Sequence, residues 1–266
     1  MLFVIDVGNS HTVTGLFTGG QLLGQYRLKS DSERTADELA IRYHALFSMA
    51  GIDKTEITSI ILASVVPSLQ AAWIQCCQNH FSVGLRHPLF VVTEKSVRSL
   101  VRVVIDQPQD VGADRLVNTI GGWQQYRCDL ILVDFGTAIT FDCVTGDCEY
   151  IGGTIMPGIG ISMEALASKT AKLPHIDISD RPEKVIGTDT VGAMKSGVMY
   201  GFGSMIDGMV DKLKTEMGGD PTDIKVIATG GMAKLIAPFT TAFDQVDQKL
   251  TLKGLQIIHE KCCSHG

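Results

Sequence analysis

Two segments of this sequence could bind a phosphorylated ligand, because each ends an apolar run with a carboxylate and a glycine turn. The first is Asp6-Val7-Gly8-Asn9-Ser10, which follows the apolar residues 2–5. Glycine lets backbone N–H groups approach a phosphate, and Asn9, Ser10 and Thr12 offer neutral donors. Asp6 would repel phosphate oxygens unless Mg²⁺ or water lay between them, so the segment implies a divalent ion. Alone, it favours an ordinary hairpin turn, in which Asp and Gly have their usual turn roles.

The second segment repeats this pattern at an offset of 128 residues. Asp134-Phe135-Gly136-Thr137 follows the apolar residues 130–133, and a second apolar stretch comes after both turns. Each copy therefore predicts a buried strand, a tight turn and a returning strand. The repetition favours a structural duplication with one phosphate-binding turn in each half.

A third candidate is Gly112-Ala113-Asp114-Arg115, which follows Pro108 and leads into an apolar helical pattern. A carboxylate near a helix N-terminus could accept a proton from a substrate hydroxyl. The guanidinium of Arg115 could form a bidentate pair with an anionic group. The alternative is a salt-bridged helix start without a role in chemistry.

Two glycine-rich segments have less specific patterns. Ala228-Thr229-Gly230-Gly231 follows a predicted strand and could lie flat against an adenine or ribose, or simply cap a helix. Residues 152–158 contain three glycines and Pro157, which predicts a shaped loop at a site or an interface. His11 lies within the first turn and could contact a nucleotide. No Walker-type lysine loop and no dinucleotide fingerprint is present.

The elements that must position these residues alternate between strands and helices, which indicates α/β halves with mixed sheets. We expect helix 33–49 to begin behind Ser30, Asp31 and Ser32, and a boundary between the halves near residues 118–128. Further helices are expected at 118–125, 159–171 and 191–217, and further strands at 59–64, 88–93 and 224–228.

Composition narrows the function classes. The chain has 266 residues, of which 45% are hydrophobic and 20% charged, as in globular proteins. A net charge of −6 argues against nonspecific nucleic-acid binding. No apolar stretch is long enough for a secretory signal or a membrane span. Seven scattered cysteines fit a reducing compartment, so we expect a cytoplasmic protein. From the charge and the short apolar stretches we expect no nucleic-acid and no membrane partner.

Together these segments resemble the type III pantothenate kinases, members of the actin-like and sugar-kinase-like ATPase superfamily. The resemblance spans nearly the whole chain, and the Gly-Ala-Asp-Arg tetrad is its most specific part. The matching segments are residues 6–10, 34–38, 64–67, 112–115, 134–138, 152–153 to 157–158, 173–174, Thr190 with 193–194 to 196–197, and 229–231.

The resemblance implies two duplicated ribonuclease H-like domains with mixed sheets flanked by helices. Residues 1–118 would form the first, with a phosphate hairpin and the tetrad at its end. Residues 119–266 would form the second, with the other phosphate hairpin, the adenosine turn and dimer helices. It also implies ATP-dependent phosphorylation of pantothenate to 4'-phosphopantothenate, the first step of coenzyme A biosynthesis, by a homodimer that uses Mg²⁺ and a monovalent cation, K⁺ or NH₄⁺.

Roles for individual residues follow from the same resemblance. Asp114 would be the general base, Asp134 would hold the monovalent cation, and Asp6 would hold Mg²⁺ through water. The residues implied in ATP binding are Asp6, Val7, Gly8, Asn9, Ser10, His11, Thr12, Val13, Thr137 and Gly230. Those implied in pantothenate binding are Ile105, Gly112, Ala113, Asp114, Arg115 and Thr190.

Ile105 departs from the family pattern, which has a tyrosine three residues before the proline that precedes the tetrad. Isoleucine can pack against the gem-dimethyl group of pantothenate but cannot donate a hydrogen bond. This departure leaves open a kinase of another small hydroxylated substrate. An accessory transcriptional regulator with the same fold is a further alternative.

Overall fold

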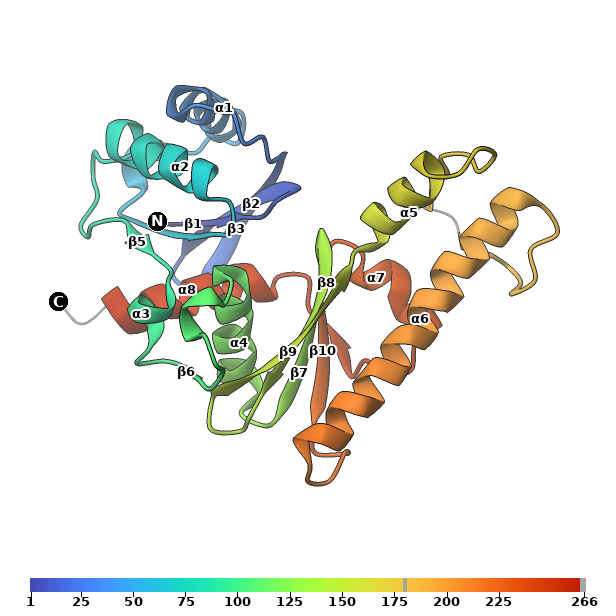
Figure 1. Cartoon of the computed structure of the whole chain (residues 1–266). Helices are drawn as coiled ribbons and strands as arrows, with labels where there is room; N and C mark the ends of the chain where they lie inside the picture. The colour runs from blue at the N-terminus through green and yellow to red at the C-terminus, as the bar shows by residue number, and fades with distance from the viewer. Residues whose placement is uncertain (179–180, 264–266) are drawn as a thin grey trace. The chain divides into compact units, whose positions relative to one another are not determined.

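The computed structural model describes residues 1–178 and 181–263, which form two compact units. One unit comprises Met1–Gln125 with Leu250–Gly266, and the other Tyr126–Lys249 (Figure 1). The chain therefore returns to the first unit at its end, and this division by packing differs from the expected division after residue 118. The last three residues of the expected second domain lie outside the described residues.

The first unit is built on a mixed sheet with the strand order β3-β2-β1-β4-β5. β1 pairs antiparallel with β2 and parallel with β4, and β2 pairs antiparallel with β3. The apolar runs predicted the two central strands, and both are buried along most of their length. The strands are β1 (Leu2–Val7), β2 (His11–Thr18), β3 (Gln21–Lys29), β4 (Ser59–Ser64) and β5 (Phe90–Val91).

Helices α1 (Ala36–Met49) and α2 (Pro67–His80) pack together on one side of this sheet (Figure 1). Their contact encloses the aromatic residues Phe3, Tyr43 and Trp73, all fully buried. Thr35 caps α1 through a capping box with Glu38, so the expected cap at residues 30–32 was wrong.

Helix α8 (Leu250–Cys263) contacts β1, β2 and β4 of the same sheet, and it also approaches α4 (Ala113–Tyr126). A Cβ atom on Gly121 would lie 2.9 Å from Cα of Gly254, so glycines allow the two backbones to meet. Thr251 donates a hydrogen bond of 2.8 Å to Asn118 Oδ1 across the contact. The short elements of the unit are η1 (Lys54–Glu56), α3 (Glu94–Val97), β6 (Arg102–Val103) and η2 (Pro108–Asp110).

The second unit repeats the strand order and the strand directions of the first. Its strands run β9-β8-β7-β10-β11, with β7–β8–β9 antiparallel and β10 and β11 parallel to β7. The shared topology supports the duplication. The strands are β7 (Leu130–Phe135), β8 (Ala138–Val144), β9 (Glu149–Pro157), β10 (Lys225–Gly230) and β11 (Gln245–Val246).

The two hairpins differ by one residue in their turns. Val7 pairs with Thr12 in the first hairpin, whereas Phe135 pairs with Ile139 in the second. The offset of 128 therefore holds along β1 and β7 and becomes 127 in the returning strands.

The glycine-rich residues 152–157 belong to strand β9, so the prediction of a loop there was wrong. Gly153 and Gly152 pair with β8, and the register shifts at Val144, leaving Ile151 as the extra residue of a bulge. Gly152 has a φ of 118°, a conformation that favours glycine. The glycines thus bend a strand instead of ending it.

The helices of the second unit are α5 (Ile159–Ser168), α6 (Thr190–Met217), α7 (Ala233–Ile236) and the short η3 (Ala237–Phe239). Their apolar faces and the sheet form one core that includes Phe141, Met199 and Ile206. Asp189 caps α6 by accepting a hydrogen bond of 2.8 Å from Gly192 N–H. α6 begins one residue before the predicted range and ends where expected.

Candidate active site

The first predicted phosphate turn joins β1 to β2 at the edge where β1 ends. Gly8 N–H donates to His11 O at 3.1 Å, which closes the turn. Asn9 and Ser10 are exposed at its tip, whereas Asp6 is half-buried and Thr12 is buried. A Cβ atom on Gly8 would lie 3.1 Å from His11 O, a tight contact. The turn therefore presents short polar side chains and accessible backbone, as phosphate binding requires.

His11 lies on this hairpin beside basic side chains of β3. His11 pairs with Lys29, and Val13, the next residue on the same face of the sheet, pairs with Arg27. Partial burial lowers the pKa of His11, and the charges of Arg27 and Lys29 lower it further. The imidazole is therefore neutral at neutral pH, and the positive charge of this face comes from Arg27 and Lys29.

The tetrad forms the start of α4. Asp114 lies in the first helical turn, and its Oδ1 accepts a hydrogen bond of 2.8 Å from Arg115 N–H. Burial raises the pKa of Asp114, and the Arg115 hydrogen bond and charge oppose that rise without cancelling it. A carboxylate with a raised pKa at a helix N-terminus is suited to accept a proton.

Val65 connects the tetrad to the first turn within the first unit. Its N–H donates to Val7 O at 3.0 Å, directly beside the turn. A Cβ atom on Gly112 would lie 3.4 Å from Val65 Cγ1. The structure therefore brings together two segments about 100 residues apart in sequence, whose proximity the sequence did not predict from spacing. Ile105 is half-buried and lies three residues before Pro108, the first residue of η2.

In the second unit, the structure brings Asp134 and Gly230 together. β10 pairs with β7 so that Gly230 lies opposite Phe135 and Thr229 opposite Asp134. Gly230 has a φ of 89°, and a Cβ atom there would lie 2.5 Å from Asp134 Oδ1. The predicted adenosine turn and the predicted cation-binding carboxylate therefore form one corner.

Thr137 lies in the second turn, against the start of α5. Gly158, the N-cap of α5, donates its N–H to Thr137 O at 3.1 Å. A Cβ atom on Gly158 would collide with the backbone oxygens of Gly136 and Thr137. This close approach explains the glycine after Pro157, whose role the composition alone did not decide.

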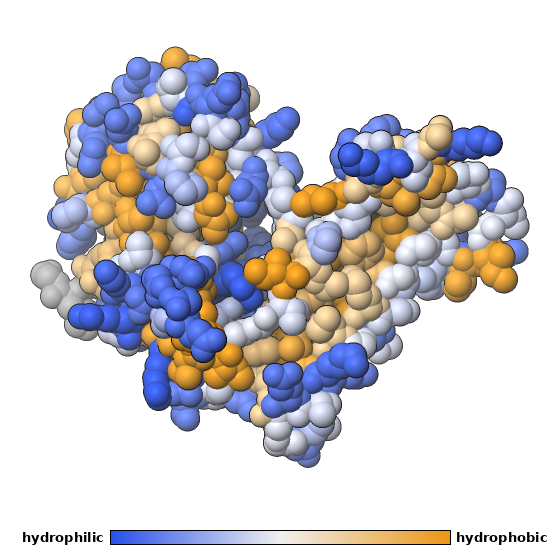
Figure 2. Space-filling model, viewed as in Figure 1, coloured by the Kyte–Doolittle hydropathy of each residue, from blue (hydrophilic) through white to orange (hydrophobic). Residues whose placement is uncertain are grey.

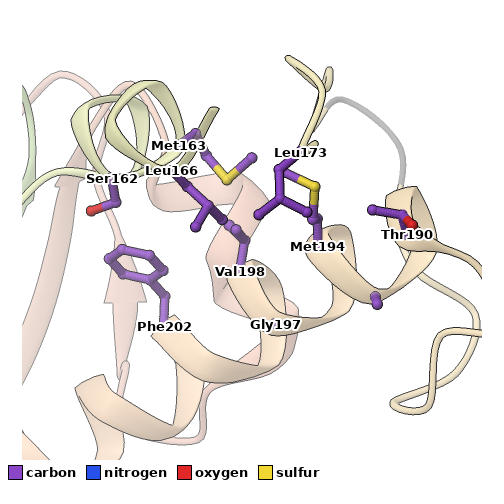
Figure 3. Close-up of a pocket in the computed structure, with 10 residues that line it drawn as sticks. Ser162, Met163, Leu166, Leu173, Thr190, Met194, Gly197, Val198 and Phe202 are labelled. Atoms are coloured by element: carbon purple, nitrogen blue, oxygen red, sulfur yellow. The ribbon is translucent and has the colours of Figure 1, made fainter. Parts of the chain in front are cut away.

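Thr190 occupies a different place in the second unit. It is the first residue of α6, is exposed, and lines a groove of about 590 Å³ between α5 and α6 (Figure 3). The walls of this groove are mainly apolar and include neither Asp134 nor Gly230. Thr190 thus lines a groove to which the other predicted site residues of this unit, Asp134, Thr137 and Gly230, do not contribute.

Within residues 1–178 and 181–263, no three or more His, Cys, Asp or Glu side chains are grouped so as to hold a metal ion. No helix in the described part of the chain is both long and apolar enough to cross a membrane.

Comparison with known proteins gives the family. Residues 2–212 match the family model of type III pantothenate kinases. A curated type III pantothenate kinase from Desulfotalea psychrophila is 57% identical over 258 residues, which cover 97% of both chains. The chain belongs to the type III pantothenate kinases. This membership confirms the predicted activity, ATP-dependent phosphorylation of pantothenate in coenzyme A biosynthesis, and a kinase of this class uses ATP with a divalent metal ion.

Solved structures of other proteins share the kinase's fold. A Campylobacter jejuni protein named as a Baf family transcriptional activator has a TM-score of 0.59 at 18% identity, covering 97% of this chain and 98% of its own. A Sinorhizobium meliloti protein named as a 2-dehydro-3-deoxygalactonokinase has a TM-score of 0.59 at 11% identity, covering 99% of each. Together with the two mixed sheets, these matches confirm the predicted fold class.

Proposed function

We propose that Asp114 is the general base that accepts the hydroxyl proton of pantothenate during phosphoryl transfer. The raised pKa of this carboxylate at the start of α4 is the observation that supports the role most directly. An Asp with an ordinary pKa would be a weak proton acceptor, and burial makes Asp114 a stronger one. Its Oδ1 accepts the hydrogen bond from Arg115 N–H, which fixes the orientation of the carboxylate at the start of the helix.

The remaining residues of the tetrad and its neighbours bind pantothenate. Arg115 is suited to the carboxylate of pantothenate because a guanidinium pairs with it bidentately. Gly112 and Ala113 present backbone without bulky side chains, and Ile105 packs against the gem-dimethyl group. Thr190 contributes from the start of α6, in the same subunit or in its partner.

ATP binds through the two Asp-Gly turns. Residues 6–13 hold the phosphates with backbone N–H groups and the exposed side chains of Asn9 and Ser10, and Thr137 adds a contact from the second turn. Gly230 leaves room for the adenosine because it has no side chain. Asp6 holds Mg²⁺ through water, and Asp134 holds a monovalent cation, K⁺ or NH₄⁺. These ions supply positive charge against the phosphates and the two carboxylates.

The active kinase is a homodimer, and a second copy covers the groove between α5 and α6. Apolar side chains gather over these helices (Figure 2). The exposed apolar residues there include Ile161 of α5 and Val191 of α6, and Ile155 of β9 adds another. Exposed apolar side chains gathered around an apolar groove are typical of a subunit interface. The kinase acts in the cytoplasm, and its net charge of −6 does not favour nucleic acid or an anionic membrane as a partner.

A substrate panel tests the proposal. Purified kinase with ATP, Mg²⁺ and K⁺ should form ADP when pantothenate is added and show little turnover with sugars of similar size. Replacing K⁺ by Na⁺ should lower the rate. Turnover with a sugar but not with pantothenate would instead identify a kinase of another hydroxylated substrate, which Ile105 leaves open. No turnover with any of them would favour the regulatory alternative.

A further inference from the structure

The residues that hold the first phosphate turn in place lie on a segment whose residue types alone indicate no chemistry. Ser30 follows β3 directly and is half-buried beside the turn. Its Oγ donates a hydrogen bond of 2.6 Å to Gly8 O, and its N–H donates one of 2.9 Å to Ser10 O. One residue therefore binds two carbonyl groups of the turn that we propose to hold the ATP phosphates.

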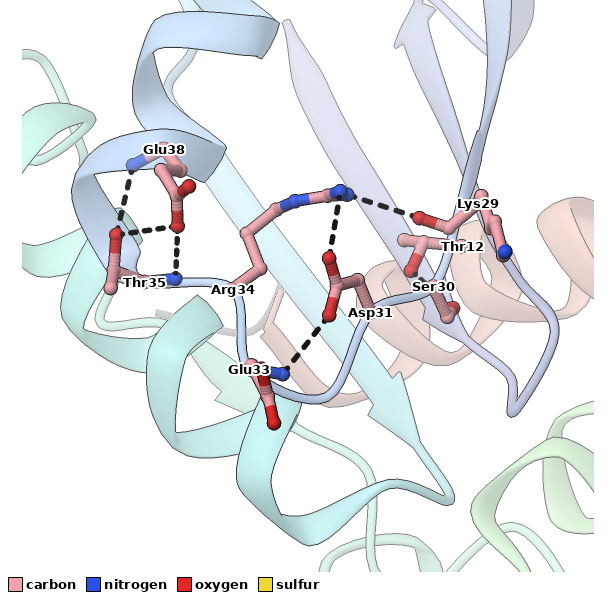
Figure 4. Close-up of polar contacts among 8 residues, drawn as sticks. All are labelled: Thr12, Lys29, Ser30, Asp31, Glu33, Arg34, Thr35 and Glu38. Atoms are coloured by element: carbon pink, nitrogen blue, oxygen red, sulfur yellow. Dashed lines mark hydrogen bonds and ion pairs between the residues drawn. The ribbon is translucent and has the colours of Figure 1, made fainter.

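Ser30 also determines which way the hydroxyl of Thr12 points. The two hydroxyl oxygens lie 3.1 Å apart (Figure 4). A carbonyl can only accept, so the single hydroxyl hydrogen of Ser30 is used on Gly8 O. The hydrogen between the two hydroxyls is then that of Thr12, which donates to Ser30. In this arrangement the Thr12 hydroxyl has no hydrogen left to donate to a phosphate oxygen.

The segment that carries Ser30 is itself held on both sides. Arg34 donates to Lys29 O at 3.0 Å and forms an ion pair of 3.3 Å with Asp31, the residues before and after Ser30. Figure 4 shows the Arg34 side chain reaching back to this segment from the loop just before α1. The Arg34 side chain is only 12% exposed, but that of Asp31 is 50% exposed, so water still reaches the ion pair.

We propose that Ser30 is a positioning residue for ATP. It fixes the carbonyl groups of Gly8 and Ser10 on one side of the turn, so that the backbone N–H groups on the other side stay aligned for the phosphates. A turn whose donors are already aligned loses less conformational freedom when ATP binds. The inference rests on the proposed role of residues 6–13 in binding the phosphates.

The test is steady-state kinetics of the full-length kinase with Ser30→Ala, with ATP and pantothenate varied separately. The Ala variant keeps the backbone bond to Ser10 O and loses only the hydroxyl contacts. The KM for ATP should rise about threefold to tenfold, which is within the range for the net contribution of one hydrogen bond. The KM for pantothenate should stay within about twofold. Ser30→Thr, which restores a hydroxyl, should recover most of the ATP affinity, and the exposed Ser32→Ala is the matched control.

A double-mutant cycle with Thr12→Val adds an independent readout. The effects of Ser30→Ala and Thr12→Val on the KM for ATP should be less than additive, because each removes the same hydroxyl contact. An unchanged KM for ATP in Ser30→Ala, or equal changes in both KM values with no recovery by Ser30→Thr, would overturn the inference. If Asn9→Ala and Ser10→Ala also leave ATP binding unchanged, the proposed role of the turn itself fails. If those two variants weaken ATP binding but Ser30→Ala does not, only the positioning role fails.

Discussion

At the scale of single residues, the electrostatic environment of Asp114 connects stability to chemistry. Burial raises the pKa of this carboxyl above its ordinary value of 3.8, and the Arg115 charge only partly offsets that effect. The folded protein therefore binds a proton at Asp114 more tightly than the unfolded chain does. A charged Asp114 therefore costs folding free energy, which is consistent with the catalytic role that we propose for it.

This cost predicts a pH-dependent gain in stability for Asp114→Asn. The unfolded chain loses the Asp114 proton near pH 3.8, and the folded protein loses it at higher pH. Through that window the wild type becomes progressively less stable than the variant, and above the folded pKa the difference stays constant. Below pH 3.8 the gain should vanish. Denaturant unfolding at several pH values measures it, with the exposed Asp110→Asn as control. A variant less stable than wild type at neutral pH would contradict the assigned burial effect.

Residue types alone supported much of the candidate site, but not the contacts that connect it. The carboxylate-glycine turns and the tetrad were visible because their spacing is local. Val65 and Ser30 were not assigned any chemistry from their residue types, because a backbone bond to Val7 and a hydroxyl bond to Gly8 depend on strand pairing between distant segments. Such contacts leave no local pattern.

At the scale of elements, glycines in α6 fall into two classes that sequence cannot separate. Gly203 is buried, and a Cβ atom there would collide with the backbone carbonyl of Phe239. Gly208 is exposed, and a Cβ atom there would have no neighbour within 4 Å. The first glycine allows close packing of α6 against η3, and the second only weakens the helix.

The two glycines therefore predict opposite effects of alanine. Gly203→Ala should lower the free energy of unfolding by about 1–3 kcal/mol, the usual cost of overpacking. Gly208→Ala should raise it by about 0.5–1 kcal/mol, because alanine has the higher helix propensity. Urea unfolding of both variants gives the comparison. Equal effects of the same sign would show that the close contact with Phe239 does not matter.

The predicted boundaries were most accurate where a hydrophobic pattern continues over many residues, as in α6. They were least accurate where glycines were taken as the sign of a loop, as in residues 152–158. Residues 152–157 form part of β9 because cross-strand pairing with β8 and a bulge accommodate the glycines. Helix α1 begins at Ala36 because Thr35 and Glu38 form a capping box, a more specific signal than the polar residues before it.

At the scale of the whole molecule, the duplication was predictable because its two turns repeat, whereas the return of α8 to the first unit was not. The contact of Gly121 with Gly254 joins residues more than 130 positions apart, and no local pattern predicts it.

The apolar groove between α5 and α6 predicts the oligomeric state. The kinase should be a dimer at micromolar concentration, and Leu166→Glu should shift it towards monomer because Leu166 lines the groove. Val83 is more exposed than Leu166 and lies in the first unit, so Val83→Glu should leave the dimer intact. Light scattering after size-exclusion chromatography distinguishes these states. A wild-type monomer, or a dimer unaffected by Leu166→Glu, would show that the groove is not the interface.

The most direct test of the account is the rate of pantothenate phosphorylation by Asp114→Asn, measured with ATP, Mg²⁺ and K⁺ beside wild type and Asp110→Asn. Asparagine keeps the shape and the hydrogen bond to Arg115 N–H but cannot accept the proton. We expect kcat to fall by about 10²–10⁴, the usual contribution of a general base, with Asp110→Asn near wild type. A folded Asp114→Asn variant that phosphorylates pantothenate at the wild-type rate would contradict the central role of Asp114.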